Sequence, residues 1–119
     1  MSAATRAVVE AHIAAFNGKD LPGVVAGFAD DAVFVTGEHM VVGHRGLRAL
    51  FAQAFDGMDA RLHLQRAVVE GETAACEMQE TIVLEHTTLE VPLAAFFIVR
   101  DEVIVRAKVY REGSATLDA

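Results

Sequence analysis

Cysteine is almost absent from this sequence, which holds a single one, Cys76, among its 119 residues. One cysteine cannot form a disulfide framework within the chain or supply a cysteine-rich zinc site. A chain without disulfides suits a reducing compartment, so we expect the protein in the cytoplasm. The residue pattern turns Cys76 toward an apolar interior, where a thiol stays protonated and unreactive.

Basic residues are also few, since 10 lysines and arginines stand against 17 aspartates and glutamates, which gives a net charge of -7. Proteins that bind nucleic acid or anionic membranes normally present a basic face, so we expect neither as a partner. No stretch approaches the ~20 uninterrupted apolar residues of a membrane span. The first residues lack the pattern of a secretory signal peptide.

Metal and cofactor motifs are missing as well. No two histidines stand at helical i, i+4 spacing or form an H-x-H pair, and no glycine-rich phosphate loop is present. We therefore predict neither a metal site nor a bound cofactor. The five histidines are His12, His39, His44, His63 and His86.

Apolar residues, in contrast, are abundant. They make up 53% of the chain, which is ample for a packed core. A length of 119 residues suits one domain and leaves little room for a second. We predict a single domain spanning residues 1–119.

Two helices are predicted near the N-terminus. Residues 5–17 carry apolar side chains at helical spacing, and Gly18 ends that helix. Asp20 is placed to cap a second helix, which is predicted to run to about Ala29. Pro22 falls in its first turn, where a missing N–H does no harm. The apolar positions of the first helix are Val9, Ile13 and Phe16.

A short strand and a third helix follow. Residues 32–36 predict the strand, and Gly37 begins a turn toward residues 40–42. Gly43 begins the helix and Gly57 ends it. The apolar side of this helix holds Leu47, Leu50, Phe51 and Phe55.

From residue 61 onward the period changes from helical to alternating, which predicts four long strands in antiparallel succession. Helices followed by a run of hairpins indicate an α+β fold. We expect a cone-shaped, curved antiparallel sheet with three N-terminal helices, which would fold over itself and leave a pocket. The four strands are predicted at 61–70, 73–85, 89–100 and 103–112.

The alternation also predicts which side chains face inward. In the second long strand the inward face holds Cys76, Met78, Glu80, Ile82 and Leu84. In the last strand it holds Val103, Val105, Ala107 and Val109, while Arg106, Lys108 and Tyr110 face outward. The outward face of mixed charge is either solvated or an interface between two copies.

Three segments carry a family resemblance: AFNGKDLPGVVAGFADDAVF at 15–34, VGHRGLRALF at 42–51 and DEVIVRAKVYRE at 101–112. They resemble the nuclear transport factor 2-like superfamily, which includes SnoaL-like cyclases and ketosteroid isomerases. The resemblance implies a cystatin-like α+β cup and a homodimer. It implies no single activity, since members include isomerases, dehydratases, epoxide hydrolases, cyclases and proteins without catalysis.

Ketosteroid isomerase offers a residue-by-residue test of activity. That enzyme uses a tyrosine and a protonated aspartic acid to hold an oxyanion, and a second aspartate to move the proton. By resemblance the tyrosine position becomes His12, the base becomes Thr36 and the protonated acid becomes Ala94. Threonine and alanine cannot replace titrating carboxylates, so we expect no ketosteroid isomerase activity.

Glu80 and His12 are the predicted catalytic residues. Glu80 interrupts an apolar inward face, where a lone carboxylate is costly to ionise and suits acid–base work. A register slip of one residue would instead place Glu80 on the surface. His12 lies on the apolar stripe of the first helix, where it would polarise a substrate oxygen or pair with Glu80. The alternative is a core histidine with a backbone partner.

Glu38 and His39 lie in the turn after the first strand. A small shift would bring Glu38 to the mouth of the pocket, in place of the missing aspartate. A solvated turn is the alternative.

The remaining site prediction is an apolar wall for a flat ligand, although the same residues would also serve as ordinary core. The predicted ligand-lining residues are Phe16, Phe28, Phe34, Thr36, Met40, Phe55, Met78, Ala94, Phe96 and Val109. We expect the phenylalanine and methionine side chains in this list to face inward, and Phe51 as well.

Three functional hypotheses follow. The first is a small soluble domain that binds a small apolar molecule in its cup. If this domain is an enzyme, we expect a cofactor-free isomerase, dehydratase or cyclase that uses Glu80 and His12. The second is a non-catalytic binding module with the same cup. The third is a dimerisation or partner-binding domain whose cup is filled by its own side chains.

Overall fold

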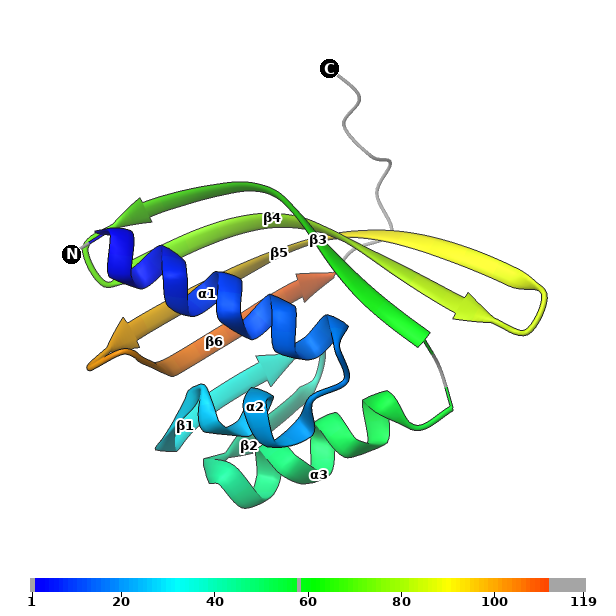
Figure 1. Cartoon of the computed structure of the whole chain (residues 1–119), viewed down its shortest axis with the longest axis horizontal. Coiled ribbons are helices and arrows are strands. Elements are labelled where there is room, and N and C mark those ends of the chain that lie inside the picture. The colour runs from blue at the N-terminus through cyan, green and yellow to red at the C-terminus, as the bar shows by residue number, and fades with distance from the viewer. Residues whose placement is uncertain (1, 58, 112–119) are drawn as a thin grey trace.

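A computed structural model describes residues 2–57 and 59–111 of the protein (Figure 1). They form three helices and six strands. The helices and five of the strands follow in the order that the sequence predicts, whereas the strand at residues 39–42 lies where only a turn was predicted. The elements are α1 (Ser2–Asn17), α2 (Leu21–Ala26), β1 (Phe28–Thr36), β2 (His39–Val42), α3 (Gly43–Phe55), β3 (Asp59–Glu70), β4 (Thr73–Leu84), β5 (Thr87–Arg100) and β6 (Val103–Arg111). The last position of the predicted strand 103–112 lies outside the described residues.

Helix α2 begins as predicted but ends earlier. The carboxylate of Asp20 accepts a hydrogen bond from the Gly23 N–H at 3.1 Å, which caps the helix. The helix ends at Gly27, because the Gly27 carbonyl accepts a hydrogen bond from the Ile104 N–H at 2.9 Å and draws the chain into the sheet. Residues 28 and 29, predicted as helix, therefore belong to β1, which begins four residues before its predicted start.

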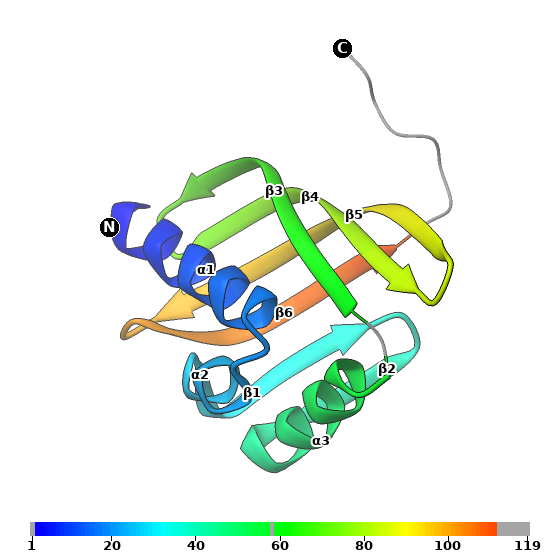
Figure 2. The ribbon, with the colours of Figure 1, turned by 45° about the vertical axis from the view of Figure 1, so that its right-hand side comes forward.

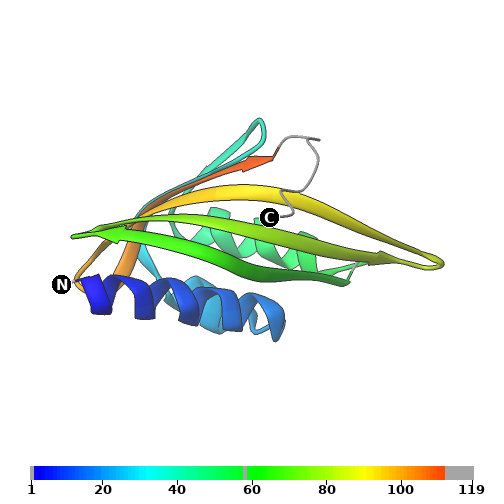
Figure 3. The same cartoon turned by 90° about the horizontal axis from the view of Figure 1, so that it is seen from above.

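The six strands form one sheet in the order β2-β1-β6-β5-β4-β3. Every neighbouring pair is antiparallel except β1 and β6, which run parallel, so the sheet is mixed rather than wholly antiparallel. The sheet curves strongly, and the helices lie on its concave side (Figures 2 and 3). The predicted α+β cone is confirmed. No helix among the described residues is long and apolar enough to cross a bilayer.

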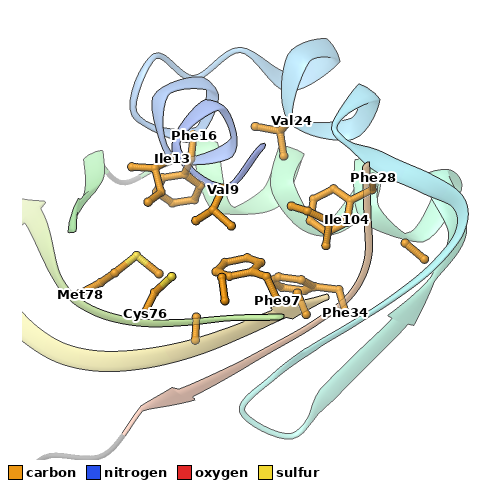
Figure 4. Packing of buried hydrophobic residues seen from close by; sticks show 14 of the residues in the cluster. Val9, Ile13, Phe16, Val24, Phe28, Phe34, Cys76, Met78, Phe97 and Ile104 are labelled. Atoms are coloured by element: carbon orange, nitrogen blue, oxygen red, sulfur yellow. The ribbon is translucent and has the colours of Figure 1, made fainter. Parts of the chain in front are cut away.

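The core fills the space between α1 and the concave face of the sheet. Figure 4 shows Ile13 and Phe16 of α1 on one side, with Met78 and Phe97 of the sheet facing them. These four side chains are at most 8% exposed. The helical spacing of α1 thus buries the stripe that the sequence predicts.

The inward alternation of β4 is confirmed over most of its length. Cys76, Met78 and Glu80 are all buried. Leu84, however, is 41% exposed. It stands at the end of the long β4–β5 hairpin, which extends beyond the helices (Figure 1), so no helix covers it.

Strand β6 departs from the predicted alternation in its first half. Ile98 pairs with Arg106 and Val99 pairs with Ile104, so Val105 is an extra residue in a β-bulge. The buried side chain is consequently Ile104, and the prediction was wrong for Val103 and Val105, which are only half-buried. Beyond the bulge, Ala107 and Val109 face inward as predicted.

Two other side chains predicted to face inward lie on the outside. Phe96 is 48% exposed on the outer face of the sheet, and its neighbour Phe97 takes the buried position at 1%. Met40 is 66% exposed on β2, the edge strand. The prediction was wrong for both residues.

Candidate functional site

A cavity of about 280 Å³ lies between α1, α3 and the concave face of the sheet. Its volume is near the lower end of the range for small-molecule pockets. Five of the predicted ligand-lining residues line it, together with His12 and Glu80. These five are Phe16, Phe34, Thr36, Met78 and Val109.

The other predicted ligand-lining residues lie elsewhere. Phe28 is 1% exposed and packs behind the cavity, and the ring of Phe55 packs 5.4 Å from that of Phe16. Ala94, Phe96 and Met40 do not line the cavity. On β5 the alternation turns Leu93 inward rather than Ala94, so the position that the resemblance assigns to the protonated acid lies on the outer face. Leu93 cannot titrate either.

Several lining residues were not predicted as ligand contacts. Most are apolar and come from α3 and the long strands: Leu50, Phe51, Ala54, Ala60, Leu62, Ile82, Leu93 and Phe97. The exception is Arg111, at the end of β6. Its alternation with Ala107 and Val109 was the signal that would have identified it as inward-facing.

Glu80 faces the cavity, and its side chain is only 7% exposed. A register slip to the surface is therefore excluded. The carboxylate is not alone, as the sequence suggested, because Arg111 Nε donates to Glu80 Oε1 at 3.1 Å. This ion pair offsets much of the free energy that burial of an unpaired carboxylate would cost.

Arg111 also donates a hydrogen bond from Nη1 to Thr36 Oγ1. Thr36 ends β1, Arg111 ends β6, and these strands are parallel neighbours, so their ends meet at the same edge. Thr36, Glu80 and Arg111 thus form one polar cluster on an otherwise apolar wall. Arg111 keeps 37% of its side chain exposed, which places it at the mouth of the cavity.

His12 is buried in aromatic surroundings, at 6% exposure. The rings of Phe28, Phe51 and Phe97 lie 5.3, 6.0 and 5.7 Å from its imidazole. Burial without a charged partner lowers the pKa of His12 to about 4, so the imidazole is neutral at neutral pH. His12 Nδ1 has no hydrogen-bond partner within the described chain. The predicted backbone partner is therefore missing at this nitrogen, and Glu80 pairs with Arg111 rather than His12.

The turn after β1 contributes nothing to the cavity. Glu38 and His39 are both exposed, and neither lines the pocket. The arrangement agrees with a solvated turn. Thr36 does line the cavity, so the first-strand position next to the site carries a hydroxyl and no carboxylate.

The described lining residues include one histidine, His12, one carboxylate, Glu80, and no cysteine. Within residues 2–57 and 59–111, no three histidine, cysteine, aspartate or glutamate side chains are close enough to hold a metal ion. Cys76 is buried, and its burial raises the pKa of the thiol. Proton transfer and hydrogen bonding are the chemistry that the lining residues can supply.

Comparison with known proteins agrees with this architecture. The model of the SnoaL-like domain family matches residues 9–107. No curated protein matches the sequence.

Several solved structures share the fold. An LEH-like epoxide hydrolase of M. tuberculosis has a TM-score of 0.85 and 20% identity, over 93% of this chain and 84% of that one. TerC, co-crystallised with polyporic acid, has a TM-score of 0.83 and 18% identity, over 92% of each chain. A putative polyketide cyclase of Xanthomonas campestris pv. campestris has a TM-score of 0.79 and 23% identity, over 92% of this chain and 90% of that one. At such identities the likeness shows the fold alone.

Proposed function

Since the chain belongs to the family of SnoaL-like domains, we propose that its cup binds a small, largely apolar molecule. The observation that carries this proposal is the cavity of about 280 Å³, which is lined mainly by aromatic and aliphatic side chains and has one polar cluster at its mouth. Apolar walls with a few convergent polar groups are typical of ligand pockets. Structural neighbours named as an epoxide hydrolase and a polyketide cyclase support a small-molecule role.

Filling the cavity should abolish binding. Ala54 of α3 lines the cavity, whereas Ala52, two residues earlier on the same helix, is exposed. We expect Ala54→Phe to weaken the binding of the neutral apolar dye Nile red at least ~tenfold, or about 1.4 kcal/mol, because the new ring occupies the ligand's space. Fluorescence titration measures the change.

Ala52→Phe is the matched control, with the same substitution on the solvent side, and it should bind the dye as the wild type does. Equal affinities for both variants would contradict a ligand site in the cup. A wild type that binds no dye would favour the domain whose cup is filled by its own side chains.

A second candidate function is cofactor-free acid–base catalysis by Glu80. The observation in its favour is a carboxylate that faces an apolar cavity while only Oε1 bonds Arg111. Glu80 would take a proton from a ligand C–H or O–H and return it at another atom, which suits an isomerase, dehydratase or cyclase. His12, a neutral imidazole beside the cavity, would polarise a ligand oxygen.

Conversion of a natural ligand distinguishes the two functions. Molecules that co-purify with the protein from its source would be extracted and followed by mass spectrometry. If Glu80 moves a proton, wild type should transform such a molecule and Glu80→Gln should slow the reaction by a factor of ~100 or more. Glu77→Gln, on the outer face of the same strand, should leave the rate unchanged. A ligand that wild type retains unaltered would indicate a binding module.

We also propose that two copies associate through the outer face of the sheet. Phe96 and Tyr110 are each 48% exposed there, and their ring centroids lie 5.9 Å apart. We expect sedimentation equilibrium to give a dimer mass for wild type and a monomer mass for Phe96→Lys, since the new ammonium would stand opposite Lys108, its cross-strand partner, and two like charges in the interface oppose association. Met40→Asp, which alters an exposed apolar residue on β2, should remain dimeric. A monomeric wild type would refute this interface.

A further inference from the structure

The polar cluster carries no net charge. Among the described residues that line the cavity, the acidic and basic side chains are Glu80 and Arg111, and they form an ion pair with each other. Thr36 adds a neutral hydroxyl, and burial keeps His12 neutral at neutral pH. A ligand in the cup therefore meets a charge-balanced site within apolar walls.

Within residues 2–57 and 59–111, the cluster also has hydrogen-bonding groups of two kinds that remain unused. The guanidinium of Arg111 bonds Glu80 through Nε and Thr36 through Nη1, which leaves the N–H groups of Nη2 as donors. Glu80 bonds Arg111 through Oε1, which leaves Oε2 as an acceptor. The donor on Arg111 and the acceptor on Glu80 thus belong to two residues that their own ion pair holds together.

This arrangement discriminates by charge. A carboxylate ligand would satisfy Arg111 but would bring a second anion beside Glu80 into an apolar cavity, and that charge would have no counter-ion. The net charge of -7 on the chain also repels anions. A neutral ligand introduces no such imbalance.

The arrangement also distinguishes ligands that carry one oxygen group from ligands that carry two neighbouring ones. A ligand with one carbonyl can accept from Arg111 but leaves Glu80 Oε2 desolvated and without a donor. A ligand with neighbouring hydroxyl and carbonyl groups satisfies both residues at once. We infer that the cup selects neutral hydroxy-carbonyl compounds, with the carbonyl on Arg111 and the hydroxyl on Glu80, an inference that rests on the proposed binding function.

Three matched probes test this selection: α-hydroxyacetophenone, acetophenone and phenylacetate. They share a phenyl ring and differ in carrying a hydroxyl with a carbonyl, a carbonyl alone, or a carboxylate. Displacement of Nile red from wild type should rank α-hydroxyacetophenone first, at least ~tenfold tighter than either of the others. This ranking needs no variant, so it does not depend on how a substitution affects folding.

Glu80→Gln should change the order. The substitution leaves Arg111 uncompensated, so phenylacetate should gain at least ~tenfold in affinity and become the tightest probe. Glu77→Gln removes the same charge from the outer face of β4, and it should keep the wild-type order. Circular dichroism would verify that both variants fold.

The outcomes separate the two proposals. If wild type binds neither Nile red nor any probe, the cup binds no small molecule and the proposed function fails. If wild type binds Nile red but prefers phenylacetate, binds acetophenone as tightly as α-hydroxyacetophenone, or binds no probe, binding stands and the inferred selectivity is wrong. An unchanged order in Glu80→Gln would likewise overturn it.

Discussion

Replacing Phe97 with alanine is expected to lower the free energy of unfolding by about 3–5 kcal/mol. Phe97 is 1% exposed near the C-terminal end of β5 and faces α1 (Figure 4). Its ring lies 5.7 Å from that of His12. Removing a buried phenyl ring costs its transfer free energy and leaves a cavity that the sheet and α1 cannot close. Urea unfolding monitored by circular dichroism gives the change.

Phe96, the preceding residue, is a control of the same chemistry on the opposite face. At 48% exposure it loses far less contact, so Phe96→Ala should cost about 1 kcal/mol or less. Both variants would be compared at a protein concentration where copies do not associate, because dimerisation alters apparent stability. Equal losses for Phe96→Ala and Phe97→Ala would contradict the inward assignment of Phe97.

Acid should weaken the fold through His12. Burial holds the pKa of His12 at about 4 in the folded protein, against 6.5 for an ordinary histidine. The unfolded chain then binds a proton more readily than the folded one between these values. Stability is therefore unaffected by this group above pH 6.5 and falls as the pH drops, by about 3 kcal/mol at pH 4.

His12→Leu tests this dependence because leucine cannot titrate. The variant should lose a large part of the decline in stability between pH 6.5 and pH 4 that wild type shows in urea unfolding. His63→Leu, which removes an exposed histidine from β3, should retain the wild-type slope. If the free energy of unfolding declined equally with falling pH in wild type and in His12→Leu, burial would not lower the pKa of the imidazole as inferred.

Much of the fold could be predicted from the sequence where apolar and polar residues contrast. The spacing of Val9, Ile13 and Phe16 placed α1, and the short turns placed the four long strands within a few residues. Glu80 was identified as inward-facing because Met78 and Ile82 flank it at the strand period. The comparison with ketosteroid isomerase likewise showed from the sequence that Thr36 stands where that enzyme has a carboxylate.

The pattern did not distinguish Phe96 from Phe97, since every residue from Leu93 to Val99 is apolar and alternation needs a polar residue to show phase. The parallel pairing of β1 with β6 joins segments from opposite ends of the chain, and no local signal marks it. The ion pair of Glu80 with Arg111 spans 31 positions for the same reason. Such contacts are set by tertiary packing rather than by local sequence.

The bulge at Val105 determines which side chains of β6 reach the mouth of the cup. Successive side chains of a strand point to opposite faces, and one additional residue exchanges the faces for every residue that follows. Because of this reversal, Val109 and Arg111 are directed toward the cavity, and Arg106, Lys108 and Tyr110 toward the outside. The chemistry of the site therefore depends on how many residues separate the β5–β6 turn from Arg111. Inserting or deleting one residue in that segment would exchange the inward-facing and outward-facing side chains of β6 without substituting any of them.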